Sequence, residues 1–287
     1  MKIRRARNQI EKIQVENKEV KGVEELKKAA HKHFKNLLSA KEEMVEYEYF
    51  LLHKKQKKRD QNVEMCKEIT EEEVVAAIWS LHLDKAPGPS GFTIAFFISH
   101  WYTIRKYFLR MVKNVFKKKI GSNTKSSYLA LVPKESNPST FNRYCLISLC
   151  NSSYKIITKI PSDRIKEVLP IIIFENQGGF VPNRQIIDNV IIVHEVVHSS
   201  MLRQEKGIII QLNMENASDR VIHPYLMDVL QKFCFSREII EFIQACISIS
   251  TPWIAPIING RLSEFFQSTR GLRQGFPLLP FLYIIMV

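Results

Sequence analysis

The segment KGIIIQLNM, residues 206–214, decides the predicted fold. Its run of apolar, β-branched residues is typical of a strand buried in a sheet. The chain continues through NASDRV (216–221) into a helical pattern over about 223–233. Further on, residues 253–266 alternate around Asn259-Gly260, a dipeptide typical of a tight hairpin. A turn, STRGLRQGFPLLP (268–280), precedes a hydrophobic helix that begins near Pro277.

Helical patterns dominate the residues before this strand. Residues 1 to about 62 are charged and helix-prone, and a basic linker is expected at 53–60. Thr70 and Glu73 form a capping box that opens the next helix, which ends at KAPGPSGF (85–92). Other predicted elements are an amphipathic helix with Leu26, Ala30, Phe34, Leu37 and Leu38 inward (23–38), helices at 92–118, 151–169 and 185–201, and a strand at 128–134. The predicted class is α+β, helix-rich with a small antiparallel sheet.

The charge of the chain indicates a polyanionic partner. The 287 residues carry a net charge of +13, with pI near 9.5. Residues 105–119 hold seven basic side chains and no acidic one, with Phe108 and Phe116 on the apolar stripe. This helix face is either a nucleic-acid contact or a solvated surface. The basic stretch at 53–60 has the composition of a nuclear-localisation patch, and a solvated linker is the alternative.

The sequence predicts an intracellular, reducing setting without a membrane partner. It has an odd number of cysteines, five, with no C-x-x-C pair. It also shows no secretory signal and no run of about eighteen apolar residues.

The segment HEVVH, residues 194–198, matches the zinc-protease pattern H-E-x-x-H. In that pattern two histidines one helical turn apart hold Zn²⁺ and the glutamate acts as general base. An amphipathic helix that carries two histidines explains the same letters. SSMLRQEKG, after His198, offers no third histidine, so no zinc site is predicted.

Six motifs in order resemble the reverse transcriptase of a LINE-type (non-LTR) retrotransposon of the plant kind. They are DKAPGPSGF, LVPK, ISLCNSSYKIITK, GGFVPNRQIIDNVIIVHEVVHS, NMENASDRV and RGLRQGFPLLP. The resemblance implies the fingers and partial palm of a right-hand polymerase. It divides the chain into a charged helical region preceding the polymerase (1–62), a fingers-like helical region (63–205) and a partial palm (206–287). The family carries a similar HEVVH-containing helix without being a protease.

The resemblance also implies roles for individual residues. Asn213 stands where the family has a catalytic metal-binding Asp, and Asp219 matches a second acidic position, with helix capping as its alternative role. The positions implied to contact nucleotide or template are Arg270, Gly271, Gln274, Gly275, Lys134, Lys155, Arg164 and Arg184. For the four basic positions, Lys134, Lys155, Arg164 and Arg184, the alternative interpretation is a solvated surface charge. Mg²⁺, RNA, DNA and deoxynucleoside triphosphates are the ligands that the family implies.

Departures from the family's motifs predict an inactive, truncated fragment. Ser90, Cys145, Leu146 and Phe276 replace an Asp, an Arg, a Pro and an Asp of the PGPDG, YRPISL and RGLRQGDP motifs. The sequence ends at FLYIIMV, before the YADD-like hairpin, so the Mg²⁺ site is expected to be incomplete and the last helix to lack a partner surface. The two hypotheses are an inactive reverse-transcriptase fragment and a non-enzymatic nucleic-acid-binding remnant. The oligomeric state is left open.

Overall fold

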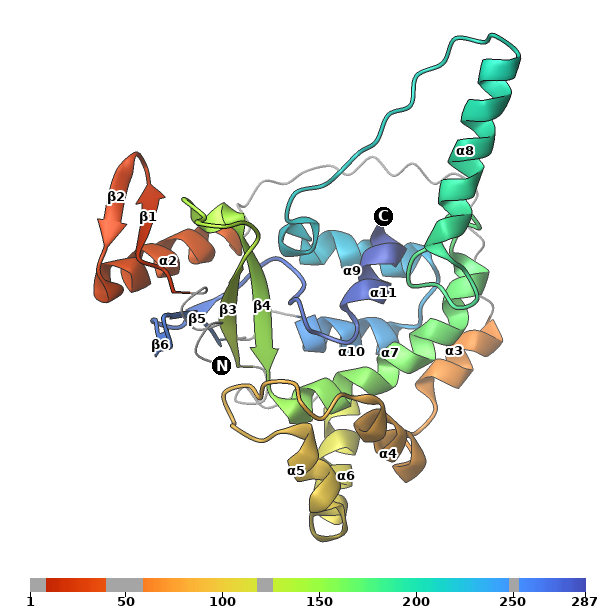
Figure 1. Cartoon of the computed structure of the whole chain (residues 1–287). Helices are drawn as coiled ribbons and strands as arrows, with labels where there is room; N and C mark the ends of the chain where they lie inside the picture. Colours follow the sequence, from red (N-terminus) through yellow and green to blue (C-terminus); the bar gives the residue numbers. More distant parts are fainter. Residues whose placement is uncertain (1–8, 40–58, 118–125, 248–252) are drawn as a thin grey trace.

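The computed structural model describes residues 9–39, 59–117, 126–247 and 253–287 (Figure 1). Its helices are α2 (Val23–Leu37), α3 (Arg59–Cys66), α4 (Glu71–Ser80), α5 (Ile94–Ser99), α6 (Trp101–Phe116), α7 (Ser152–Ile172), α8 (Ile186–Leu202), α9 (His223–Lys232), α10 (Arg237–Ile247) and α11 (Leu279–Met286). Its strands are β1 (Lys12–Val15), β2 (Lys18–Lys21), β3 (Ser127–Pro133), β4 (Tyr144–Cys150), β5 (Trp253–Ile258), β6 (Arg261–Leu262) and β7 (Phe266–Gln267). Two short 3₁₀ turns, η2 (Phe141–Arg143) and η3 (Ala217–Arg220), complete the described elements.

A mixed sheet brings distant parts of the chain together. The strand order is β4-β3-β5-β6, and β7 pairs with the other end of β5. Strands β3 and β4 are antiparallel over seven residue pairs, whereas β3 and β5 are parallel. Helix α2 covers this sheet and buries Leu26, Ala30 and Phe34 in one cluster with Leu129 and Ile254. The predicted α+β class is confirmed. The sheet, however, is mixed, because β5 follows a long helical excursion and runs alongside β3 in the same direction.

The second core surrounds α7, which lies centrally in Figure 1. This helix buries Tyr154, Ile156, Ile157 and Ile160, and the Tyr154 hydroxyl donates to the carbonyl of Cys246 in α10 at 2.6 Å. Helices α3, α4 and α11 also contact α7. Helix α11 buries Leu282, Ile284 and Ile285 in the same cluster. The expectation that the last helix lacks a partner surface is therefore wrong, because α7 and α9 provide one.

The loop KAPGPSGF (85–92) is fastened to the start of α7. A Cβ on Gly88 would lie 2.4 Å from the Asn151 backbone nitrogen, so only glycine fits there. The Asn151 side chain accepts from the Ser90 amide at 2.8 Å, and the Ser152 hydroxyl donates to the carbonyl of Phe92 at 2.6 Å. The Lys155 ammonium reaches the carbonyl of residue 86 at 3.2 Å. Three side chains at the start of α7 thus hold the loop.

Several local predictions are confirmed by the structure. The capping box at Thr70 forms, and Asn259 and Gly260 make the turn between β5 and β6 with φ of 51° and 81°. Phe108 is buried, and Phe116 stacks on Phe242 with ring centroids 4.1 Å apart. The linker expected at 53–60 falls almost entirely outside the described residues; only Arg59 and Asp60 are seen, at the start of α3.

Three element predictions are wrong. The region before residue 62 is not uniformly helical, because Glu16 and Asn17 adopt positive φ and close the β1–β2 hairpin. The helix expected at 92–118 breaks at His100 (φ −106°, ψ 12°), where the Ser99 hydroxyl and the His100 ring bond to carbonyls of α5. Residues 206–214 are extended but belong to no strand, and Ile208 is 89% exposed. A strand needs a partner ladder, and the described residues provide none there.

Candidate nucleotide site and basic face

Asp219 lies in η3, between the extended segment 206–214 and α9. It is only 4% exposed, and burial raises the pKa of its carboxyl from 3.8 to about 6, while the positive charge of Lys134 partly opposes this. The alternative role in capping is not seen, because the residue at the N-terminus of α9 is Ile222, without a side-chain cap. Asp219 is therefore a buried carboxyl whose pKa is shifted toward neutrality.

The loop RGLRQG (270–275) closes over Asp219. Gly271 has a φ of +86°, and a Cβ there would lie 2.8 Å from the Asp219 carbonyl oxygen. The Gly271 amide donates to the carbonyl of Val221 at 2.8 Å, and the Leu272 amide donates to that of Ser218 at 2.7 Å. The Gln274 side-chain amide lies 3.5 Å from Asp219 Oδ2. The glycine permits this close approach and places a hydrogen-bonding amide beside the carboxyl.

The same loop is anchored on both sides. The Ser148 amide of β4 donates to the Gln274 carbonyl at 2.9 Å, and a Cβ on Gly275, whose φ is +101°, would lie 3.0 Å from the Ser148 carbonyl oxygen. On the other side the Arg270 guanidinium donates through Nε to the carbonyl of Leu37 at 2.6 Å. The loop therefore joins the sheet to the end of α2, and Arg270 is used for that attachment.

Two residues that sequence reasoning missed complete the site. His223 Nε2 lies 2.9 Å from the Gly271 carbonyl, and burial lowers the pKa of its ring. Asn216, at a φ of 51°, presents Oδ1 at 3.5 Å from the Lys134 ammonium. The sequence NASDRV indicates the turn at Asn216, because asparagine readily adopts positive φ in a turn. Nothing in the sequence indicates that His223 contacts the Gly271 carbonyl.

The structure brings Lys134, Asp219, Gly271 and Gln274 together around η3, and Gly275 lies next to them against Ser148 of β4. Asn213 lies outside this arrangement, exposed on the extended segment.

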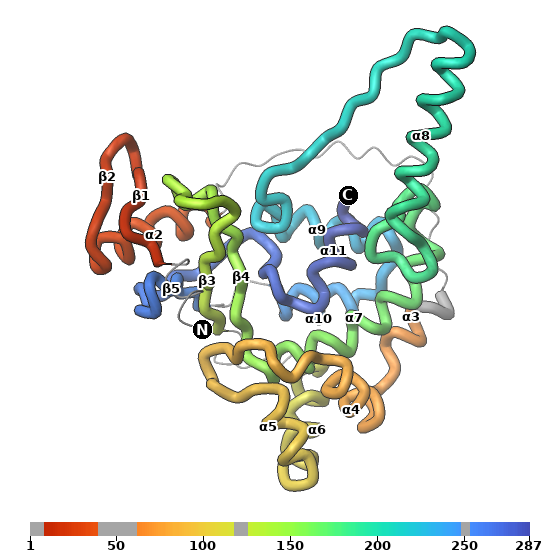
Figure 2. Tube along the Cα trace, viewed as in Figure 1, coloured from red at the N-terminus to blue at the C-terminus, as the bar shows by residue number. Residues whose placement is uncertain are grey.

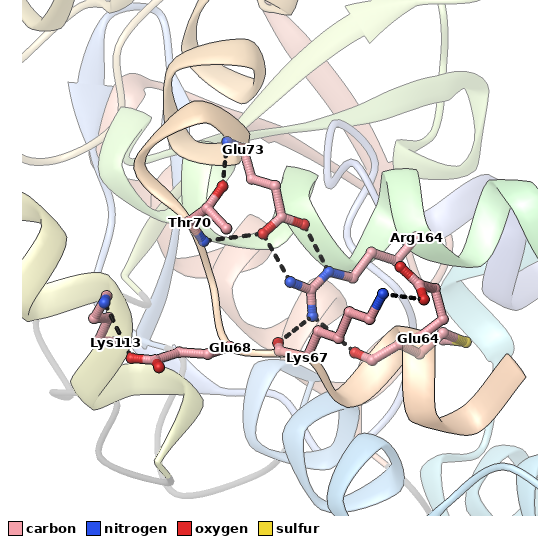
Figure 3. A network of polar contacts seen from close by, with 8 residues as sticks. Glu64, Lys67, Glu68, Thr70, Glu73, Lys113 and Arg164 are labelled. Atoms are coloured by element: carbon pink, nitrogen blue, oxygen red, sulfur yellow. Dashed lines mark hydrogen bonds and ion pairs between the residues drawn. The ribbon is translucent and has the colours of Figure 1, made fainter. Parts of the chain in front are cut away.

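All four basic positions implied by the motifs make contacts within the fold; the Lys134 ammonium donates to the carbonyl of Asn142 at 3.1 Å. The Arg164 guanidinium forms two 2.8 Å bonds to the Glu73 carboxylate and two more, also 2.8 Å, to the carbonyls of Met65 and Lys67 (Figure 3). Arg184 donates to carbonyls at the end of α7, including that of Ile173 at 3.0 Å. Lys155, 7% exposed, has its pKa lowered by burial. Their contact with nucleotide or template stays a prediction, and all four have backbone partners.

The described residues do not fit a pair of bound divalent cations. No three His, Cys, Asp or Glu side chains among them gather in a group that could hold a metal ion. Mg²⁺ takes several anionic or carbonyl oxygens in octahedral geometry, whereas Asp219 supplies a single carboxyl to this site. His194 and His198 lie on α8, where no side chain is buried.

A second candidate surface is the outer face of α6, defined by Tyr102, Lys106, Tyr107, Arg110 and Lys117. All five side chains are exposed, with Tyr102 at 87% and Tyr107 at 74%. The opposite face buries Phe108, Val112 and Val115 in the core. Within the part of the chain that the structure describes, no carboxylate lies within ion-pair distance of the three cations of this face. Residues 118 and 119 of the predicted cluster lie outside the described residues.

Residues 132–287, more than half of the chain, match the family model of the reverse transcriptase (RNA-dependent DNA polymerase). The chain therefore belongs to the reverse transcriptase family, whose members bind nucleic acids and deoxynucleoside triphosphates and use a divalent metal.

The chain is also similar to the transposon TX1 uncharacterized 149 kDa protein of Xenopus laevis, with 31% identity over 220 residues. This match covers 76% of the chain and 17% of that protein. The predicted membership of the non-LTR retrotransposon reverse transcriptases is confirmed, and the chain is a reverse-transcriptase fragment. The plant kind stays a prediction. Among the described helices, none combines the length and apolarity needed to cross a bilayer.

Proposed function

We propose that this reverse-transcriptase fragment binds RNA and DNA without base specificity through the outer face of α6. The observation that carries the proposal is the arrangement of Lys106, Arg110 and Lys117 along one exposed stripe with Tyr102 and Tyr107 beside them. Cations neutralise phosphates, and exposed aromatic rings stack on bases of any identity. The buried stripe on the other side of α6 fixes this face toward solvent.

The neighbouring charges support the same assignment. The ammonium of Lys113, on the same helix, is paired with Glu68 at 3.0 Å, so it contributes less to phosphate binding than an unpaired lysine. Arg105 lies with its guanidinium carbon 6.0 Å from the Tyr102 ring centroid. Among the described residues, none of the three cations of this face has a carboxylate within ion-pair distance. The Tyr102 ring beside them is in contact range of a further cation, the Arg105 guanidinium.

The test is fluorescence anisotropy of labelled single-stranded RNA and DNA of mixed sequence, titrated at several salt concentrations. Replacing Lys106, Arg110 and Lys117 together by Gln is expected to reduce the slope of log K against log salt by about 2 to 3, at roughly 0.7–0.9 per phosphate contact. The matched control replaces Lys18, Lys28 and Lys166 by Gln; all three are exposed and, like the three cations of α6, have no carboxylate within ion-pair distance among the described residues, so the net charge changes equally. Equal slopes for both triple variants, or tight binding at high salt, would contradict the assignment of α6.

The second part of the proposal is that the fragment does not catalyse nucleotidyl transfer. Asn213 carries a neutral amide where the family has a carboxylate, and Asp219 alone supplies one carboxyl, whose pKa burial raises to about 6. Phe276, at the position of the motif's Asp, is 3% exposed and stacks on Tyr154 with ring centroids 5.5 Å apart. An apolar ring packed into the core replaces a charged side chain there.

Primer extension on poly(rA) with Mg²⁺ or Mn²⁺ tests this part. We expect no template-dependent incorporation by the chain or by Asn213→Asp, because losing a metal ligand typically costs a factor of about 10³ or more in rate, and one restored carboxylate does not rebuild a two-metal site. Incorporation by either protein above a heat-inactivated control would refute the proposal. The anisotropy measurement on the same preparations confirms that the protein tested is folded and able to bind.

A further inference from the structure

Helix α8 projects away from the rest of the molecule, and the extended segment 206–214 returns from its far end (Figures 1 and 2). None of the residues of α8 is buried. Most surface helices of a globular protein bury an apolar stripe against the core. In α8 the apolar side chains face solvent instead, so this helix has surface to bury and no partner within the described chain.

The apolar residues of α8 follow the spacing of a helix-pairing seam. Ile186, Val190, Val193 and Val197 stand at i, i+4, i+7 and i+11. This alternation of three and four residues places them on one side of the helix as a and d positions, the arrangement by which one helix packs against another. Ile192 lies on another side of the helix. The pattern favours a helical partner over a flat or extended one.

The seam belongs to a large exposed apolar surface. Nine large apolar side chains of α8, including Ile186, Val190 and Val193 of the seam, are 45–73% exposed, and five more on the returning segment 208–214 are 60–89% exposed. Together they present on the order of 1,000 Å² of apolar surface per copy, more than a typical monomer leaves exposed in one patch. Patches of this size on soluble proteins mark interaction sites.

We propose that a second copy of this chain covers the seam, with the two α8 helices packed antiparallel. A seam that pairs with itself gives a closed two-fold dimer, because the same patch serves on both copies. Antiparallel packing places the two bodies at opposite ends of a helix about 25 Å long, at 1.5 Å per residue. Parallel packing would bring two bodies of net charge +13 side by side. The a and d layers then match when Val193 of each copy lies opposite Val190 of the other and Ile186 lies opposite Val197.

This inference is independent of the proposed nucleic-acid binding, and sedimentation velocity over a range of protein concentrations, from submicromolar upward, tests it. We expect a concentration-dependent dimer. Val193→Glu should raise the dimer dissociation constant by about tenfold or more, because it places a charge in the seam. The matched control is Ile192→Glu, which adds the same charge at a neighbouring position of similar exposure (55% against 48%) on another side of the helix. It should change the constant by less than about threefold.

Because neither side chain is buried in the single chain, circular dichroism and the melting temperature of the monomer should be unchanged in both variants. The double variant Val190→Lys/Val193→Glu tests the orientation. In the antiparallel register the introduced carboxylate of one copy faces the introduced ammonium of the other, so the double variant should dimerise more tightly than Val193→Glu alone. Weaker dimerisation of the double variant would overturn the antiparallel register. A monomer at every concentration, or association that Val193→Glu leaves unchanged, would overturn the proposal.

Discussion

Ionisation of the buried Asp219 carboxyl should lower the free energy of unfolding at neutral pH, and Asp219→Asn should remove that loss. The pKa of this carboxyl is about 6 in the folded chain against 3.8 for the unfolded group. Between these values the folded state holds a proton that the unfolded state releases. The contribution of this group to the free energy of unfolding therefore falls as the pH rises from about 4 to 6 and is lowest above pH 6.

The size of the effect follows from the two pKa values. A difference of roughly two units, at about 1.36 kcal/mol per unit, gives about 3 kcal/mol at pH 7.5 and less than about 1 kcal/mol at pH 4. Asparagine has nearly the same shape and no charge, so Asp219→Asn should raise the free energy of unfolding by about 2 to 3 kcal/mol at pH 7.5.

The assay is urea unfolding of both proteins at pH 7.5 and at pH 4, followed by tryptophan fluorescence. The matched control is Asp84→Asn, which removes an exposed carboxylate in a loop and should stay within about 0.5 kcal/mol of the parent at both pH values. A variant at position 219 no more stable than the parent at pH 7.5 would refute the reasoning. So would a gain of equal size at pH 4, because it would arise from packing and not from ionisation.

Three further predictions concern other parts of the chain. Arg164→Met should lower the free energy of unfolding by about 3 kcal/mol, measured in urea, because it leaves the Glu73 carboxylate and two carbonyls without their shared donor; Arg164→Lys should recover little, since an ammonium cannot reproduce the two-pronged contact. Hydrogen exchange over 207–214, at concentrations where the chain is monomeric, should be close to that of an unstructured peptide, while β3 is protected; slow exchange in the first segment would show that it pairs with another strand. Metal analysis after chelation and zinc re-addition should find no tightly held zinc at HEVVH, and one zinc per chain that is lost on His198→Ala would contradict this.

Local chemistry explains which elements could be predicted from the sequence. The Thr70 capping box and the Asn259-Gly260 turn depend on residues within a few positions of each other, so the letters determine them. The segment 206–214 has the composition of a buried strand, but a strand is stabilised by neighbours elsewhere in the chain, and the letters do not show whether they are present. The break at His100 arises from side chains that compete for helix carbonyls, which apolar periodicity does not report.

The candidate site was predictable to a similar extent. The motif letters of RGLRQG located a loop that does lie against Asp219, because its glycines are required by close backbone approach. The contacts of Arg164 could not be anticipated, since its partner Glu73 is ninety-one residues away in sequence and only the packing of α4 on α7 brings them together. His223 faces the loop for the same non-local reason.

The attachment of the loop 85–92 to α7 also determines how the molecule can move. Two prolines and two glycines in eight residues suggest a hinge between the helices α4 to α6 and the sheet. Yet the side chains of Asn151, Ser152 and Lys155 hold this loop at its two ends and its middle, and Gly88 lies directly against the backbone where β4 becomes α7. A rotation about this loop would have to break these contacts together. We therefore expect a displacement of α5 on one side to be transmitted to β4 on the other.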